Sequence, residues 1–110
     1  MQIKIDFRRA GIEDAEIYYL WANDDLVRKN SYEQQKISLE NHMEWFKNKL
    51  ASSDCFLYFF RTEQIPVGQV RIENKANENV IGISIDSKFR GKGLGSKMLE
   101  MACNDYFIKL

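Results

Sequence analysis

The sequence is poor in the residues that form disulfide bridges, backbone breaks and metal sites. It contains one proline, two cysteines and one histidine in 110 residues. Cys55 and Cys103 lie far apart and in no metal-ligand spacing, so we expect two thiols rather than a disulfide framework. Because His42 is the only histidine, we expect no metal site, and Ser-His-Asp or Cys-His catalysis would have to use this residue.

Net charge and long apolar runs are also absent. The 16 basic and 16 acidic side chains cancel, whereas proteins that bind nucleic acid usually have a basic excess over the whole domain. Residues 1–6 lack the apolar core of a signal peptide, and no stretch is long enough to cross a bilayer. We therefore expect a cytoplasmic protein whose partners include neither nucleic acid nor a membrane.

The sequence does have the apolar side chains that a core requires. Hydrophobic residues make up 45% of the chain and aromatic residues 13%, enough for one domain over residues 1–110. Alternating polarity predicts strands over 2–7, 66–72 and 80–86, and a continuous aromatic run predicts a buried strand over 55–61. Helical spacing predicts helices over 12–21, 39–50 and from 93 onward. The order βααβββα indicates an α+β fold with a mainly antiparallel sheet and a turn over 74–79.

The predicted helices and the last strand each have a core-facing side. The stripe of the first helix contains Ile12, Ala15, Tyr19 and Ala22. The stripe of the second contains Leu39, Met43, Phe46 and Leu50. In the last strand Ile81, Ile83 and Ile85 share one face, while small or polar residues occupy the other, so we expect that second face to stay open.

The segment that carries chemistry runs from this last strand through a basic, glycine-rich turn directly into a helix. Such a junction presents unpaired backbone N–H groups and the positive end of a helix dipole, which together bind anions. The turn lacks side chains at Gly91, Gly93 and Gly95, and Arg90 and Lys92 add positive charge beside them. A phosphorylated ligand suits this turn.

Two common phosphate loops do not match the segment. The dinucleotide pattern G-x-G-x-x-G, counted from Gly91, meets Ser96 where its third glycine should be. The mononucleotide loop requires serine or threonine after Gly-Lys, and here Lys92 is followed by Gly93. The pattern that does match is Arg90-x-x-Gly93-x-Gly95, in which the sequence resembles the GNAT superfamily of acetyl-CoA-dependent N-acetyltransferases.

This resemblance implies an acyltransferase that transfers acetyl from acetyl-CoA to a primary amine and needs no metal. In the family the loop wraps the pyrophosphate of coenzyme A, and the preceding strand pairs with the pantetheine arm as another strand would. The cofactor-binding residues that it implies are Ile83, Ile85, Arg90, Gly91, Lys92, Gly93, Leu94, Gly95 and Ser96.

The N-terminal half resembles one subgroup more closely. The pattern Trp21-x-Asn23-Asp24, followed by Val27-Arg28, Ser31, Ile37, His42 and Trp45-Phe46, is similar to enzymes that acetylate the 4-amino group of nucleotide-linked amino sugars, as in pseudaminic acid biosynthesis. It is also near the enzymes that acetylate ribosomal protein N-termini. The resemblance implies substrate-binding roles for Trp21 and Arg28 and places His42 near the acceptor sugar. The sequence departs from the pattern at Ala22, where the subgroup often has arginine.

Acetyl transfer to an amine needs a base, a donor to the acetyl carbonyl oxygen and a proton for the leaving thiolate. Candidate bases are His42, Glu73 and a water relayed by Ser84. A backbone N–H of residues 83–85 is the expected donor to the carbonyl oxygen. Holding the two reactants together supplies much of the rate without a covalent enzyme intermediate.

The chain stops after the cofactor-binding helix, before the strand and the tyrosine-bearing helix with which family domains continue. We therefore expect a C-terminally truncated GNAT fold with an exposed strand edge that favours a homodimer. Two alternatives to the amino-sugar enzyme remain open: a catalytically incomplete module that binds CoA or only self-associates, and a protein N-terminal acetyltransferase.

Overall fold

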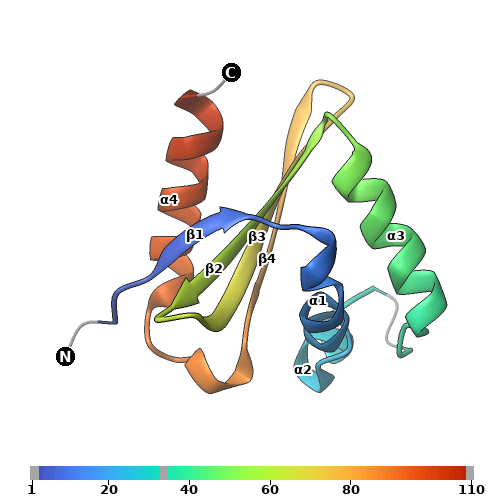
Figure 1. Ribbon diagram of the computed structural model, residues 1–110, viewed down its shortest axis with the longest axis horizontal. Coiled ribbons are helices and arrows are strands. Elements are labelled where there is room, and N and C mark those ends of the chain that lie inside the picture. Colours follow the sequence, from blue (N-terminus) through green and yellow to red (C-terminus); the bar gives the residue numbers. More distant parts are fainter. Residues whose placement is uncertain (1–2, 33–34, 109–110) are drawn as a thin grey trace.

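The computed structural model describes residues 3–32 and 35–108, and within them a four-stranded sheet lies between helices on both of its faces (Figure 1). The elements in chain order are β1 (Asp6–Arg9), η1 (Ile12–Asp14), α1 (Ala15–Ala22), α2 (Asp25–Lys29), α3 (Leu39–Ala51), β2 (Cys55–Thr62), β3 (Ile65–Lys75), β4 (Glu78–Ile85), η2 (Ser87–Phe89) and α4 (Leu94–Ile108). The predicted α+β fold is confirmed, and the predicted order βααβββα gains the short helix α2 and two short 3₁₀ turns. No helix in these two ranges is both long and apolar enough to cross a membrane.

The sheet is antiparallel throughout, in the order β1-β2-β3-β4. Two-residue turns join β2 to β3 at Glu63 and Gln64 and β3 to β4 at Ala76 and Asn77, and all four residues have positive φ. The turn predicted over 74–79 is wrong in its length, because β3 continues to Lys75 and β4 begins at Glu78, so only Ala76 and Asn77 lie between the strands. Neither turn contains the Asn-Gly or Asp-Gly signal that usually marks such tight hairpins.

The first strand begins later than predicted. The sequence pattern placed it over 2–7, of which residue 2 lies outside the described part, whereas β1 runs from Asp6 to Arg9. Pairing with β2 explains the shift, because the two arginines lie over aromatic rings of that strand: Arg8 is 4.6 Å from the Phe59 ring centre and Arg9 is 4.0 Å from that of Phe56. These cation–ring contacts stabilise the pairing of Asp6–Arg9 with β2, although the polarity of this segment does not alternate.

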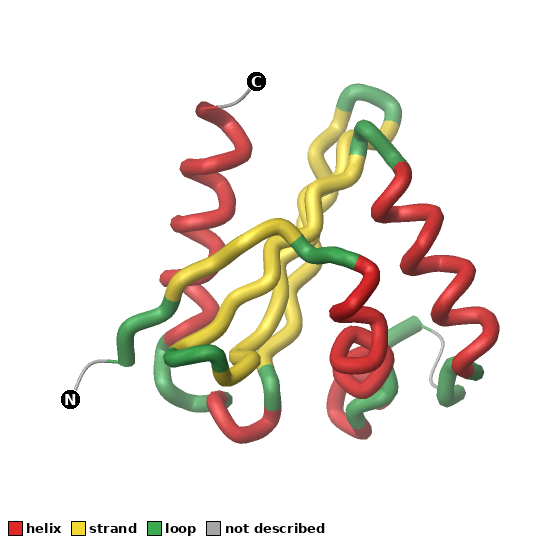
Figure 2. The backbone as a smooth tube through the Cα atoms, in the orientation of Figure 1, coloured by secondary structure: helices red, strands yellow, loops and turns green. Residues whose placement is uncertain are grey.

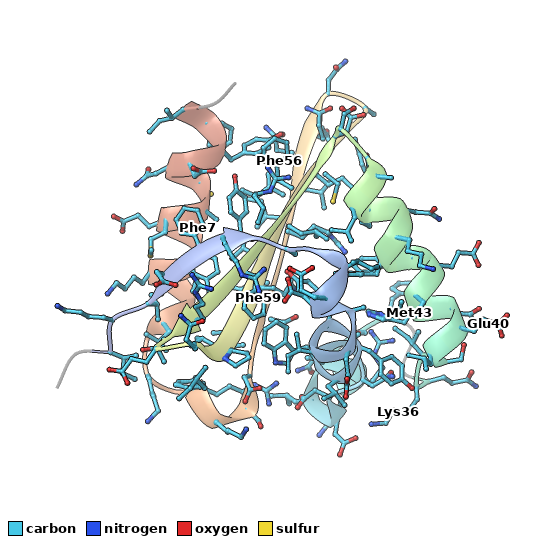
Figure 3. The ribbon with its side chains drawn as sticks, in the orientation of Figure 1. Phe7, Lys36, Glu40, Met43, Phe56 and Phe59 are labelled. Carbon is cyan, nitrogen blue, oxygen red and sulfur yellow. The ribbon has the colours of Figure 1, made fainter. Side chains whose placement is uncertain are left out.

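The sheet separates α4 from α1 and α3 (Figure 2), and a hydrophobic cluster lies on each side of it. The cluster beneath α4 is formed by Ile5, Tyr58, Phe60, Val67, Val70, Ile72, Leu94, Met98, Ala102 and Tyr106. The cluster beneath α1 and α3 is formed by Ala15, Tyr18, Trp21, Phe46, Cys55, Leu57 and Phe59. Alternate residues of β2 therefore serve opposite cores, as expected of a strand buried on both faces. Figure 3 labels Phe7 and Phe56, which pack on the α4 side, and Phe59 on the other.

The core-facing stripes of two helices differ from the predicted ones. In α1 the buried residues are Ala15, Tyr18 and Trp21, whereas Ile12 is 53% exposed. The predicted Tyr19 and Ala22 are only half-buried. Asp14 in the preceding turn is held by two hydrogen bonds from the Arg8 guanidinium, at 2.7 and 2.9 Å, and this anchor fixes the rotation at which the helix begins.

In α3 the buried residues are His42 and Phe46, and Leu39 is 55% exposed. Leu39 is the first helical residue, next to Ser38, whose side chain caps the helix by accepting from the Asn41 N–H. The cap lies at the far end of the helix from β2, so the first turn extends beyond the core (Figure 1).

Strand β4 lies at the edge of the sheet, and no other described strand pairs with its second side. Its register sets Ile81 opposite Ile72 and Ile83 opposite Val70, which face α4, so Gly82 and Ser84 face the α1–α3 side. The predicted division of this strand into an isoleucine face and a small, polar face is confirmed. The homodimer expected from the free edge stays a prediction.

Candidate active site

Two adjoining cavities lie between the α1–α3 layer and the β3–β4 half of the sheet. We call the first the inner cavity, of about 420 Å³, lined by Tyr18, Trp21, Ala22, Val27, Arg28, Ser31, Ile37, His42, Trp45, Gln69, Arg71, Gly82, Ile83 and Ser84. We call the second the loop cavity, of about 410 Å³, lined by Leu26, Val27, Asn30, Ser31, Ile83, Ser84, Ile85 and Arg90. Four residues, Val27, Ser31, Ile83 and Ser84, line both, so the cavities form one continuous cleft.

The small face of β4 makes room for the inner cavity. Gly82 pairs with Arg71 across the sheet, and a Cβ on this glycine would lie 3.3 Å from Arg71 Nη2. The glycine thus allows the guanidinium to lie close over the strand. Ser84 pairs with Gln69, whose Nε2 donates to Ser84 Oγ at 3.2 Å. Because this oxygen accepts the bond, the Ser84 O–H remains a donor.

Two arginine side chains contribute positive charge to the lining of the inner cavity. Arg28 and Arg71 line it, and none of the described residues that line it is acidic. Arg71 Nε is buried without a hydrogen-bond partner, and the guanidinium lies 5.6 Å from the Trp45 ring centre. Arg28 Nη2 lies 3.3 Å from Ser31 Oγ, which in turn donates to the Val27 carbonyl. A buried arginine N–H that lacks an acceptor suits an anionic ligand.

His42, a predicted catalytic residue, lines the inner cavity and is 2% exposed. Its Nε2 lies 3.2 Å from the Ala15 carbonyl oxygen, which can only accept, so Nε2 carries the proton and Nδ1 is the basic nitrogen. Burial lowers the pKa of His42 below its ordinary value, against the opposing effect of this hydrogen bond. The imidazole is therefore neutral at pH 7.

Glu73 and Ser84, the other two predicted catalytic residues, lie apart. Ser84 lines both cavities, whereas Glu73 lines neither. The Glu73 carboxylate is buried and accepts a hydrogen bond from Lys49 Nζ at 2.5 Å. Burial alone would raise the pKa of Glu73, but Lys49, Lys75 and Arg71 outweigh it and leave the pKa below its ordinary value. The cleft thus contains His42 and Ser84 but not the third candidate base.

Both predicted substrate-binding residues line the inner cavity, but in different ways. Arg28 lies on α2 with its side chain half-buried. Trp21 is 5% exposed, and its ring packs against Tyr18 and Phe59 with centroids 5.5 and 5.8 Å away. Its Nε1 donates to Asp86 Oδ2 at 3.0 Å. Trp21 therefore contributes little accessible surface to the cavity.

The glycine-rich turn forms an open cradle. Gly91 and Gly93 have φ of 76° and 75°, and no heavy atom lies within 4 Å of the position that a Cβ would take on either. Positive φ at these two residues is readily accessible only to glycine. With Arg90, Lys92 and the first N–H groups of α4 beside it, the turn fits a diphosphate such as that of coenzyme A.

The other predicted residues of the turn have different roles. A Cβ on Gly95 would lie 3.2 Å from Ile85 Cδ1, so this glycine allows α4 to pack closely on β4. Leu94 is 6% exposed and belongs to the core under α4. Ser96 is exposed at the start of the helix, near the cradle. Among the described residues, no group of three or more His, Cys, Asp or Glu is placed to hold a metal ion.

The sequence interpretation missed Arg71 and Gln69. Their signal was present in β3, where Val70 and Ile72 alternate with Gln69 and Arg71. Antiparallel pairing places these two polar residues opposite Ser84 and Gly82. The strand register could have identified them. Gln69 and Arg71 pair with Ser84 and Gly82, whose small side chains leave a cavity beside the sheet, and residues on the same face as that cavity line it.

Comparison with known proteins agrees with this geometry. The family model described as "Acetyltransferase (GNAT) domain" matches residues 4–110. An N-acetyltransferase from Staphylococcus aureus Mu50 superposes with a TM-score of 0.75 and 18% identity, over 96% of this chain and 68% of that one. An acetyltransferase from Thermus thermophilus gives 0.78 and 16%, over 94% and 71%.

A third similar structure is the spermidine N-acetyltransferase from Vibrio cholerae in complex with CoA and spermine. It superposes with a TM-score of 0.78 and 15% identity, over 91% of this chain and 62% of that one. The chain thus spans between about three fifths and seven tenths of the length of these structures. No curated protein resembles the chain in sequence at a significant level.

Proposed function

The chain belongs to the acetyltransferase (GNAT) domain family, an acyltransferase family that uses acetyl-CoA, and from this premise we propose which amine it acetylates. We infer that the acceptor is the 4-amino group of a nucleotide-linked amino sugar. The inner cavity binds the acceptor, and the loop cavity with the glycine-rich cradle binds the co-substrate.

The observation that carries this proposal is the charge of the inner cavity. Arg28 and Arg71 line it, and none of its lining residues in the described part of the chain is acidic, so a polycation is less suited to this cavity than a diphosphate. Glu73, the nearest acidic partner of Arg71 at 3.9 Å, is itself neutralised by Lys49. This charge favours a sugar nucleotide over a polyamine such as the spermine named for the Vibrio cholerae structure.

The co-substrate site follows from β4 and the cradle. Alternate N–H and C=O groups of β4 point away from β3 at the free edge and are available to an extended ligand. Ile83 and Ile85 contribute this edge beside the loop cavity, and Gly91, Gly93 and Arg90 receive the phosphates. Acetyl-CoA supplies the acetyl thioester when bound.

Groups of the chain then accept the proton of the acceptor ammonium and donate a hydrogen bond to the acetyl carbonyl oxygen. His42 accepts at Nδ1 a proton from the acceptor ammonium, since its imidazole is neutral and its Nε2–H is committed to Ala15. Ser84, which lines both cavities, orients a water with its free O–H. A backbone N–H of residues 83–85 donates to the acetyl carbonyl oxygen.

The test is acetyl transfer measured by thiol release from acetyl-CoA with three acceptors. We expect turnover with a UDP-linked 4-amino sugar and none with spermidine or a basic peptide. Turnover of spermidine or of the peptide alone would contradict the acceptor assignment. Calorimetric binding of CoA without turnover of any of the three would instead support a CoA-binding module.

A pair of variants tests the charge of the cavity itself. Arg71→Met would remove the proposed charge-assisted hydrogen bond to the ligand, worth about 1.5–3 kcal/mol, so kcat/KM for the sugar nucleotide should fall about 10- to 150-fold. The KM for acetyl-CoA stays unchanged. Lys75→Met is the matched control, because Lys75 is an exposed cation on the same strand outside both cavities. Equal losses in the two variants would contradict a direct role for Arg71.

A further inference from the structure

Two contacts connect the junction of α1 and α2 with the segment between β4 and α4. Trp21 Nε1 donates to Asp86 Oδ2 at 3.0 Å, and Arg90 Nη2 donates to Asp24 Oδ1 at 2.8 Å. The partners are separated by 65 and 66 residues in sequence, so neither contact follows from local structure.

Each of the two aspartates also caps its own segment. Asp24 Oδ1 accepts from the N–H groups of Leu26 and Val27 at the start of α2, at 3.1 and 3.3 Å. Asp86 Oδ1 accepts from the Lys88 N–H at the start of η2, at 3.0 Å. Each carboxylate therefore fixes the first turn of one segment and a side chain that belongs to the other.

From this arrangement we propose that Asp24 is a positioning residue for Arg90. It holds the guanidinium beside the glycine-rich cradle before the co-substrate arrives, and so links occupation of the cradle to α2. The inference rests on the proposed function in one respect, that Arg90 contacts a phosphate of the co-substrate.

The number of donors on Arg90 supports a bridging role rather than a competing one. A guanidinium has five N–H donors, and the contact with Asp24 involves only Nη2. The remaining donors are available to a phosphate while the bond to Asp24 persists. The side chains of Arg90 and Asp24 are 30% and 24% exposed, so the pair is partly shielded from water and holds a long side chain in one orientation.

The same carboxylate connects the two cavities. Val27, whose N–H is capped by Asp24, lines both the inner and the loop cavity, and Leu26 and Arg90 line the loop cavity. Burial alone would raise the pKa of Asp24, but the bonds from Arg90 and from the two N–H groups hold it below its ordinary value, so the group is ionised at pH 7. A phosphate bound by Arg90 would thus be connected, through the Asp24 carboxylate, to the cap of α2.

The test is Asp24→Asn, measured by calorimetry with CoA on the full chain. Asparagine caps helices as well as aspartate does, so α2 keeps its cap while Arg90 loses its charged partner. We expect the Kd of CoA to rise about threefold to tenfold, the effect of releasing one long side chain. Asp25→Asn is the matched control: it removes the neighbouring charge, which pairs with Lys36 on the surface, and should leave the Kd unchanged.

A double variant separates positioning from a merely structural role. Arg90→Gln should raise the Kd of CoA more than Asp24→Asn does. Adding Asp24→Asn to Arg90→Gln should leave that Kd unchanged, because Asp24 acts through Arg90. An unchanged or tighter Kd in Asp24→Asn would overturn the proposal. So would an equal effect of Asp24→Asn with and without Arg90, which would show that Asp24 acts through the fold. If Arg90→Gln itself leaves the Kd unchanged, the phosphate site of the proposed function is wrong, and this outcome is distinct from the other two.

Discussion

Replacement of Gly93 by alanine adds a side chain where the backbone has a φ of 75° and where the new methyl group meets no atom within 4 Å. The cost is therefore conformational rather than steric. An L-residue in the left-handed region is destabilised by about 1–2 kcal/mol relative to glycine. A domain of this size has a free energy of unfolding of about 5–15 kcal/mol, so the variant stays folded.

The penalty can appear in either of two measurements. If the loop of the free protein keeps its conformation, the free energy of unfolding decreases by about 1–2 kcal/mol and CoA binds as before. If the free loop relaxes to negative φ, stability is retained, but binding must restore the original conformation. The Kd of CoA then rises about 5- to 30-fold, which is the same free energy. The sum of the two losses is expected to be constant.

Urea unfolding followed by circular dichroism measures the first loss, and calorimetry with CoA measures the second. Gln64→Gly is a control with the opposite sign. Gln64 has a φ of 71° in the β2–β3 turn, so glycine there should stabilise the fold by about 0.5–1 kcal/mol and leave CoA binding unchanged. A summed loss below about 0.5 kcal/mol for Gly93→Ala would refute the reasoning, because the cradle would then not need the left-handed conformation.

Two further predictions concern the groups beside the cleft. The folded pKa of His42 lies below the unfolded value of 6.5, so the unfolded chain binds the proton first and the free energy of unfolding of the wild type falls as pH decreases below about 6.5. His42→Gln should lack this component in urea titrations between pH 8 and 5.5, and identical pH profiles would contradict it. Gly68→Ala would drive a Cβ into the Ser84 carbonyl oxygen and to 2.9 Å from Met98 Cε, so the melting temperature should drop by about 10 °C or more. A change of less than about 3 °C in a thermal melt would mean that β3 and β4 move apart easily.

Most of the fold could be predicted from local patterns. The aromatic run over 55–61 predicts a strand buried on both faces because its residues are apolar at every position, and β2 has that environment. Where the pattern is incomplete, tertiary contacts decide. Arg8 and Arg9 belong to β1 because they lie over aromatic rings of β2, and no local rule for polar residues predicts such a pairing.

The candidate site was predictable only in part. The cradle could be located because Gly91 and Gly93 are a local requirement of a turn with positive φ. Arg71 and the pair between Asp24 and Arg90 depend on contacts across strands or across 66 residues of sequence. Such contacts arise from the register of the sheet and from the rotation of α1, and the predicted stripe of α1 was wrong for Tyr19 and Ala22. Ala15 is buried as predicted, whereas Tyr18 and Trp21 take the core positions expected of Tyr19 and Ala22.

Because the sheet separates two hydrophobic cores, substitutions in one core can accumulate without affecting the other. Leu57 and Phe59 belong to one core, and Tyr58 and Phe60 belong to the other, so few substitutions would disturb both. If the inner cavity binds the acceptor, as we propose, the helical layer over it can diverge toward a different amine while α4 and the cradle beside it remain intact. The contacts from Trp21 to Asp86 and from Arg90 to Asp24 join the helical layer to the segment that leads to α4, and they would limit such divergence.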